Sequence, residues 1–167
     1  MTFTSIEIKK LATDAPIPYD LLLLADETVE AINQYLTGSD IYIAMQPNEQ
    51  QPIGAMVLQE QNQQEAEIMN IAVAEHFQSQ GIGKLLIEKA VEVSQSKGYT
   101  SLKVGTGDSG YRQISFYRRN GFEVCEVRKN YFVDKFPEPV FENGVMLKDM
   151  VVLERKMGEC HKSVNPI

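Results

Sequence analysis

The chain has 167 residues, of which 43% are hydrophobic and 23% are charged, with a net charge of −7 and an isoelectric point near 4.9. This composition is typical of one globular domain, and the acidic balance argues against a general nucleic-acid binder, since phosphate backbones demand a basic surface. The longest apolar run, residues 21–25, is too short to span a membrane, and residues 1–7 lack a basic start followed by an apolar stretch. We therefore expect a cytoplasmic protein without a membrane partner.

Cysteine and histidine are scarce, with Cys125, Cys160, His76 and His161 as the full set. Their spacing fits neither a disulfide framework nor a zinc site, so no metal cofactor is expected. Cys125 falls in a predicted strand without a histidine nearby to activate it, so we expect an inert core thiol and no covalent catalysis.

The N-terminal third alternates between strand and helix patterns. Residues 5–11 alternate at period two and predict a strand, which ends before Pro16 and Pro18. Apolar residues at helical spacing predict a helix over 19–36, in two pieces around a new N-cap at Asp26 and Glu27. Strands over 40–46 and 52–59 follow as a hairpin, and a polar turn over 59–65 leads to a strand over 66–73.

The C-terminal half continues the mixture. Helices are predicted over 81–97, ended by Gly98, and near 111–119, and strands over 100–104, 122–127 and 150–155, with a proline-bearing loop over 135–139. No repeat or linker interrupts the pattern. The sequence therefore predicts an α/β (α+β) domain over residues 1–157, built as a mixed sheet with helices on it, and a polar tail over 158–167.

A glycine-rich turn occupies residues 78–84, between a predicted strand and a predicted helix. The first amides of a helix have no partner within it, and the helix dipole adds roughly half a positive charge there. Gly81 and Gly83 lack the Cβ atoms that would keep a diphosphate from the backbone, and Lys84 adds a charge. The turn therefore suits a phosphate group, although a tight turn without a ligand explains the glycines as well.

A second glycine cluster, residues 105–110, formally satisfies the dinucleotide-binding fingerprint, with Glu126 as the acidic residue downstream. The chain after Gly110 holds one short helix and a loop with two prolines, which is too little to complete a nucleotide-binding sheet. Neither cluster is a P-loop, because Leu85 follows Lys84 where that motif needs a hydroxyl.

Three segments carry a family resemblance: residues 70–73 (Asn-Ile-Ala-Val), the pattern Gln78-x-x-Gly81-x-Gly83, and residues 116–122 (Phe-Tyr-Arg-Arg-Asn-Gly-Phe). Together they resemble the GNAT superfamily of N-acetyltransferases, and the match covers roughly residues 66–127. The resemblance implies a mostly antiparallel sheet of roughly six to seven strands with about four helices, and a V-shaped splay between the fourth and fifth strands.

The same resemblance implies that acetyl-CoA is bound in this splay as a co-substrate. Its pantetheine arm would hydrogen-bond to the backbone near Ile71 and Val73, and the amide of Val73 would hold the oxyanion. The pyrophosphate would lie on the glycine-rich turn. The implied contacts in the turn are Gln78, Ser79, Gln80, Gly81, Ile82, Gly83 and Lys84.

Acetyl transfer to an amine requires a neutral amine and a proton for the leaving thiolate. An alkyl amine has a pKa of roughly 10.4, so a base must help at neutral pH. Glu67 is the candidate base, because period-two alternation puts it on the face of Met69, Ile71 and Val73, and some superfamily members use a glutamate at the matching position. Tyr117, the motif tyrosine, is the candidate acid. A solvated carboxylate and a packed aromatic ring are the structural alternatives.

One position departs from the family pattern. Many members have an asparagine seven residues before the motif tyrosine, where this chain has Gly110. We expect Asp108 or Gln113 to replace it as a cofactor contact. Arg118 and Arg119 either reach the ribose 3′-phosphate or are solvated helix residues.

The sequence thus predicts an acetyl-CoA-dependent N-acetyltransferase that acts on a primary amine, in a small molecule or a peptide, by direct attack in a ternary complex. A homodimer is compatible with this prediction. A non-catalytic acyl-CoA sensor and a dinucleotide-dependent oxidoreductase using residues 105–110 are the alternatives. The sequence does not identify the acceptor amine, although residues 19–36 and 137–144 should border its pocket.

Overall fold

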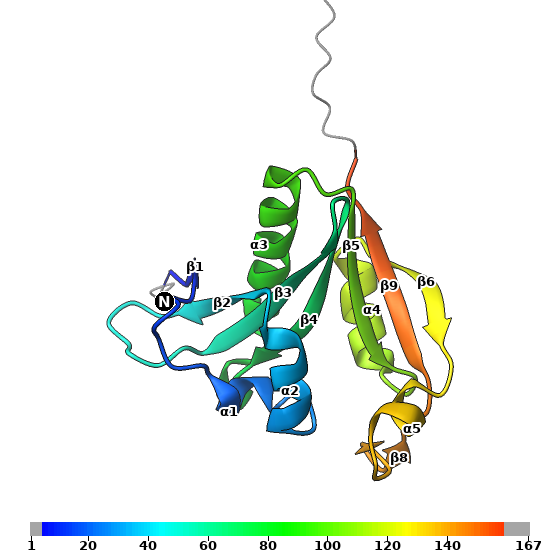
Figure 1. Cartoon of the computed structure of the whole chain (residues 1–167). Helices are drawn as coiled ribbons and strands as arrows, with labels where there is room; N and C mark the ends of the chain where they lie inside the picture. The colour runs from blue at the N-terminus through cyan, green and yellow to red at the C-terminus, as the bar shows by residue number, and fades with distance from the viewer. Residues whose placement is uncertain (1–4, 159–167) are drawn as a thin grey trace, which may run out of the picture.

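One seven-stranded sheet organises the computed structural model, which describes residues 5–158 (Figure 1). The strand order is β1-β2-β3-β4-β5-β9-β6, and every neighbouring pair is antiparallel except β4 and β5. The strands are β1 (Glu7–Lys10), β2 (Ser39–Met45), β3 (Gly54–Asn62), β4 (Glu65–Val73), β5 (Ser101–Gly107), β6 (Glu123–Arg128) and β9 (Met150–Lys156). The predicted mostly antiparallel sheet is confirmed, and residues 159–167 of the predicted tail lie outside the described residues.

The sheet opens between its two parallel strands. β4 and β5 pair only over Glu65–Ile68 and Ser101–Val104, and both strands then run on without each other, to Val73 and to Gly107. Figure 1 shows the resulting V, with β1 to β4 on one arm and β5, β9 and β6 on the other. The splay predicted between the fourth and fifth strands is therefore present.

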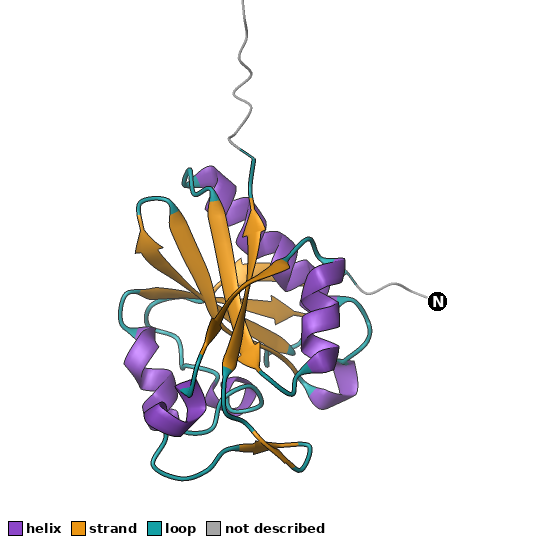
Figure 2. Ribbon diagram, turned by 90° about the vertical axis from the view of Figure 1, so that its right-hand side faces the viewer, coloured by secondary structure: helices purple, strands orange, loops and turns teal. Residues whose placement is uncertain are grey.

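Helices cover both faces of the sheet (Figure 2). Over residues 5–158 they are α1 (Tyr19–Leu22), α2 (Val29–Leu36), α3 (Ile82–Ser96), α4 (Tyr111–Arg119) and α5 (Tyr131–Lys135), with a 3-10 turn η1 (Glu75–Phe77). α3 and α4 pack on one face through the larger apolar core, and α1 and α2 pack on the other through a smaller one. None of these helices is long and apolar enough to cross a membrane.

The predicted break in the first helical segment is real but lies later than expected. Thr28, and not Asp26 or Glu27, caps α2, because its Oγ1 accepts a hydrogen bond of 3.0 Å from the amide of Ala31. Asp26 instead accepts hydrogen bonds from the Glu27 amide and the Tyr35 hydroxyl.

Two features near the C-terminus were not predicted. α5 begins three residues after the end of β6, and a two-stranded hairpin, β7 (Phe141–Glu142) and β8 (Val145–Met146), follows the predicted proline-bearing loop. Asn143 and Gly144 form its turn with φ angles of 51° and 78°, the positive values that a two-residue hairpin turn requires.

The second glycine cluster serves packing. β5 extends through Gly105 to Gly107, beyond the predicted end of the strand. A Cβ at Gly105 would lie 2.5 Å from the sulfur of Met150, and one at Gly107 would lie 2.8 Å from a methyl of Leu147. Since β5 pairs antiparallel with β9 here, the cluster is not part of a parallel dinucleotide-binding sheet.

The larger core depends on Phe122, which is fully buried beside Tyr117 with ring centroids 5.7 Å apart. We expect Phe122→Ala to lower the free energy of unfolding by about 3–5 kcal/mol, because it leaves a large cavity. Phe141→Ala is the matched control, since that ring is 59% exposed, and its effect should stay within about 0.5 kcal/mol. Chemical denaturation of both variants checks this, and equal effects would contradict it.

Candidate active site

The glycine-rich turn follows β4 after the short η1 and leads into α3. Ser79 and Gly81 have φ angles of 62° and 88°, so the backbone turns sharply before the helix begins at Ile82. The Nε2 of Gln78 donates to the carbonyl of Val73 at 3.0 Å and ties the turn to the end of β4. No backbone carbonyl of residues 5–158 accepts a hydrogen bond from the amides of residues 79–84. Those amides are available to an anion.

The two glycines of this turn have different physical roles. A Cβ at Gly81 would meet nothing within 4 Å, so the space next to its Cα is open, as a phosphate site requires. A Cβ at Gly83 would lie 3.2 Å from the ring of Phe116 in α4. The absence of a side chain at Gly83 therefore allows the close contact between α3 and α4.

β4 contains a bulge where it leaves β5. Val57 of β3 pairs with Asn70 and Leu58 pairs with Ile68, so Met69 is an extra residue on β4. After the bulge, Ile71 and Val73 pack toward α3, whereas Met69 packs toward α1 and α2. Because side chains before the bulge alternate from Ile68, Glu67 lies on the face opposite to Ile71 and Val73. The expectation that all three share one face is wrong.

Glu67 is buried and paired. Its Oε1 lies 3.3 Å from Nη2 of Arg128, whose Nε is 3.0 Å from Glu126. Arg128 belongs to β6, so its side chain spans β9 and β5, and its Nη1 lies 3.9 Å from the sulfur of Met150. Burial lowers the pKa of Arg128, but the hydrogen bonds and charges of Glu126 and Glu67 raise it overall. The guanidinium holds the Glu67 carboxylate in place.

Tyr117 lies in the larger core at 5% exposure, against the rings of Phe116 and Phe122. Burial raises the pKa of its hydroxyl well above the usual value. The phenol is protonated at neutral pH, as a proton donor must be, but burial also makes it a weaker acid than an exposed tyrosine.

Asp108 and Gln113 make contacts within the protein. The Asp108 carboxylate accepts hydrogen bonds from the amides of Lys148 and Asp149, at 3.3 and 3.2 Å, and fastens the turn after β5 to the segment before β9. Gln113 donates from Nε2 to Glu142 of the hairpin at 3.1 Å.

Gly110 has no room for the asparagine of the family pattern. A Cβ there would lie 2.8 Å from Oγ1 of Thr106 and 3.1 Å from Oε1 of Gln113. The first distance is shorter than real Cβ contacts and the second is tighter than most of them, so a side chain at position 110 would displace the side chain of Thr106. A cofactor contact by Asp108 or Gln113 stays a prediction.

A buried polar network beside the bulge was missed by sequence reasoning. Asn70 donates from Nδ2 to the carbonyl of Leu22 and to the hydroxyl of Tyr35, both at 2.9 Å, and Tyr35 donates to Asp26 at 3.1 Å. Burial raises the pKa of Tyr35. The network joins α1 and α2 to β4 at the opening of the V. An asparagine within the apolar run of residues 68–73 was the available signal.

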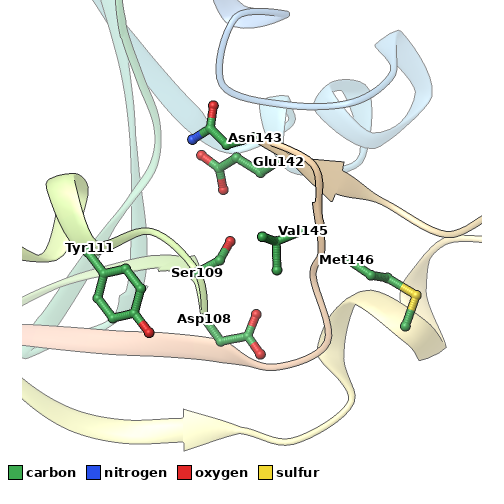
Figure 3. A pocket seen from close by; sticks show the side chains of 7 residues that line it. All are labelled: Asp108, Ser109, Tyr111, Glu142, Asn143, Val145 and Met146. Atoms are coloured by element: carbon green, nitrogen blue, oxygen red, sulfur yellow. The ribbon is translucent and has the colours of Figure 1, made fainter.

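A cavity of about 370 Å³ lies between the start of α4 and the β7–β8 hairpin (Figure 3). Its lining comes from residues 108–111 on one side and from residues 142–146 on the other. Sequence reasoning placed residues 137–144 beside a pocket but did not predict the hairpin that forms its wall.

The remaining candidates lie at the surface. Cys125 is exposed on the edge strand β6 and is not the core thiol that we expected; local desolvation and the charge of Glu154 raise its pKa. Arg118, Arg119 and His76 are also exposed. No group of three or more potential metal ligands occurs among residues 5–158.

Comparisons with known proteins agree with this geometry. Residues 9–122 match the model of the acetyltransferase (GNAT) family. An uncharacterised N-acetyltransferase, YvbK of Bacillus subtilis, is 38% identical over 135 residues, which cover 81% of this chain and 86% of the relative.

Two solved structures share the fold at substantial identity. A GNAT family acetyltransferase from Elizabethkingia anophelis with acetyl-CoA bound is 44% identical, with a TM-score of 0.87 over 91% of this chain and 98% of the other. A Bacillus subtilis acetyltransferase in complex with CoA is 34% identical, with a TM-score of 0.83 over 92% and 99% of the two chains. The chain therefore belongs to the GNAT family of acetyltransferases.

Proposed function

We propose that this protein transfers the acetyl group of acetyl-CoA to a primary amine by direct attack in a ternary complex. The observation that carries the proposal is the opening between β4 and β5, with an anion-binding turn at the end of one strand and the helix of Tyr117 at the end of the other. The acetyl-CoA bound in the Elizabethkingia relative supports it. The absence of a membrane-spanning helix from residues 5–158 is compatible with action in the cytoplasm.

The proposed cofactor position uses backbone groups left free by the splay. Beyond Ile68, β4 has no partner strand on its β5 side, so the backbone groups near Ile71 and Val73 can bond the amide-bearing pantetheine arm, although the Val73 carbonyl already accepts a hydrogen bond from Gln78. The pyrophosphate then lies on the free amides of residues 79–84, without need of a basic cluster.

The proposed acid and base approach the thioester from opposite faces of the sheet. Glu67 lies on the face of α1 and α2, while Tyr117 projects from α4 on the other face. Glu67 takes a proton from the amine, whose lone pair attacks the thioester carbonyl, and the amide of Val73 stabilises the oxyanion. The C–S bond then breaks as Tyr117 donates its proton to the departing thiolate. The attacking nitrogen gives up its second proton, which restores the Tyr117 phenol and leaves a neutral amide.

Binding of the pyrophosphate by the glycine-rich turn can be tested by adding one negative charge. Ser79 is exposed with φ 62°, a conformation that asparagine and aspartate both tolerate. We expect Ser79→Asp to weaken acetyl-CoA binding about tenfold by repelling the pyrophosphate, and Ser79→Asn to change it little. Calorimetric titration with acetyl-CoA measures both, with NAD as the control ligand. Equal affinities of the two variants, or binding of NAD alone, would contradict the assignment.

Tyr117→Phe isolates proton donation, because only the hydroxyl is removed from the packed ring. We expect kcat to fall about 10- to 100-fold, with the affinity for acetyl-CoA nearly unchanged. Tyr42→Phe in β2, a buried tyrosine of the same core, is the control and should retain kcat. Unchanged turnover in Tyr117→Phe would remove this residue from the mechanism.

Glu67→Gln tests the base. We expect kcat to fall about 100-fold at neutral pH, and the deficit to shrink as the pH approaches the amine pKa of about 10.4, where the amine is neutral without help. Glu65→Gln is the matched control on the same strand and face, where Glu65 pairs with Lys103 at 3.0 Å. A deficit that is independent of pH, or equal in the control, would show that Glu67 is not the base. The readout is release of free CoA.

A further inference from the structure

The cavity beside α4 has a chemistry of its own. Figure 3 shows Asp108, Ser109, Glu142 and Val145 between the start of α4 and the hairpin, with Tyr111 and Met146 at its two ends. All six residues line the cavity. None of the lining residues is a lysine, arginine or histidine. Neither carboxylate of the cavity forms an ion pair with another residue of 5–158. The cavity therefore disfavours the phosphates of the cofactor and favours a cation.

Its polar groups are held in fixed positions. Glu142 is oriented by Gln113, which donates to its Oε1, and Asp108 is oriented by the backbone amides of residues 148 and 149. A cation entering between them would meet prearranged charge, with little ordering left to do.

The hydroxyl of Ser109 is the second, independent observation. Its Oγ is buried and has no hydrogen-bond partner among the described residues, and Figure 3 shows it directed toward Glu142 and Val145. A buried hydroxyl without a partner carries a free-energy cost that a ligand N–H group would remove.

The remaining walls are apolar and unusually exposed. Tyr111, Val145 and Met146 are 77%, 52% and 48% exposed, respectively. Such a surface suits the methylene groups of an alkyl chain, whose transfer out of water is favourable.

α4 sets the distance from this cavity to the proposed reacting centre. Tyr111 precedes Tyr117 by six residues on the same helix, which corresponds to a rise of about 9 Å. A ligand with two polar ends about 9 Å apart and apolar atoms between them matches this separation along the helix axis.

We propose that the cavity binds the second, protonated amino group of an aliphatic diamine or polyamine acceptor, while the other amino group reacts. This proposal rests on the proposed function for the reacting end only. The recognition of the protonated end depends on Glu142 and Ser109 and can be measured by binding, without turnover.

The binding test uses hexamethylenediamine and hexylamine, which differ only in the second amino group. Calorimetric titration of the CoA-loaded protein should show that the diamine binds at least about fivefold more tightly than the monoamine. Glu142→Gln keeps the shape of the side chain and its contact with Gln113, and it should abolish this difference. Glu138→Gln is the matched control, since it removes the same charge from an exposed position outside the cavity.

A second variant tests cation binding without a change at Glu142, in case Glu142→Gln acts through the shape of the hairpin. Val145→Lys adds a cation at an exposed wall position, and it should also abolish the preference for the diamine while circular dichroism shows an intact fold. Loss of the preference in Glu138→Gln to the same extent, or its persistence in Glu142→Gln and Val145→Lys, would overturn the proposal.

Turnover separates this proposal from the proposed function. In the wild type, kcat/KM for the diamine should exceed that for the monoamine by a similar factor, and the ratio should fall toward one in Glu142→Gln. If neither amine is acetylated but binding of the diamine still depends on Glu142, the proposed function fails and the cation site stands. If both amines are acetylated with equal kcat/KM and bind equally, the cation site fails and the acetyltransferase proposal stands.

Discussion

The end of hydrogen bonding between β4 and β5 after Ile68 and Val104 is the constraint on which the rest of the structure depends. Backbone amides and carbonyls need partners, so strands that part inside a sheet leave groups that only a ligand or water can satisfy. The glycine-rich turn continues from one of these strands and α4 from the other. One interruption of the sheet therefore places the glycine-rich turn, Glu67 and the helix of Tyr117 around a single opening.

The extra residue at Met69 changes which side chains of β4 lie on each face of the sheet. Before it, Glu67 faces away from α3 and meets Arg128; after it, Ile71 and Val73 turn their side chains into the core of α3, and their backbone remains at the opening. Asn70 then anchors α1 and α2 at the same point. A strand of regular alternation would offer its polar and apolar residues to the wrong sides along half of its length.

The parts of the site that the sequence predicted are local. The turn over residues 78–84 and the helix of Tyr117 follow from glycine spacing and helical periodicity, and the splay came from the family resemblance. The bulge at Met69 could not be predicted, because it depends on the register with β3. The Glu67–Arg128 pair joins residues 61 apart, which no local period signals. The hairpin turn at Asn143 and Gly144, in contrast, carries the Asn-Gly signal and could have been found.

The contact between Gly83 and Phe116 joins two motifs that are separate in the sequence, the glycine-rich turn and the segment over residues 116–122. The ring of Phe116 lies where a side chain at position 83 would be, and the next residue along α4 is Tyr117. A side chain at position 83 would therefore press the glycine-rich turn against the helix that bears the candidate acid, unless the ring of Phe116 moves. The sizes of the residues at these two positions are therefore coupled, so that a larger residue at position 83 is best accommodated beside a smaller residue at position 116.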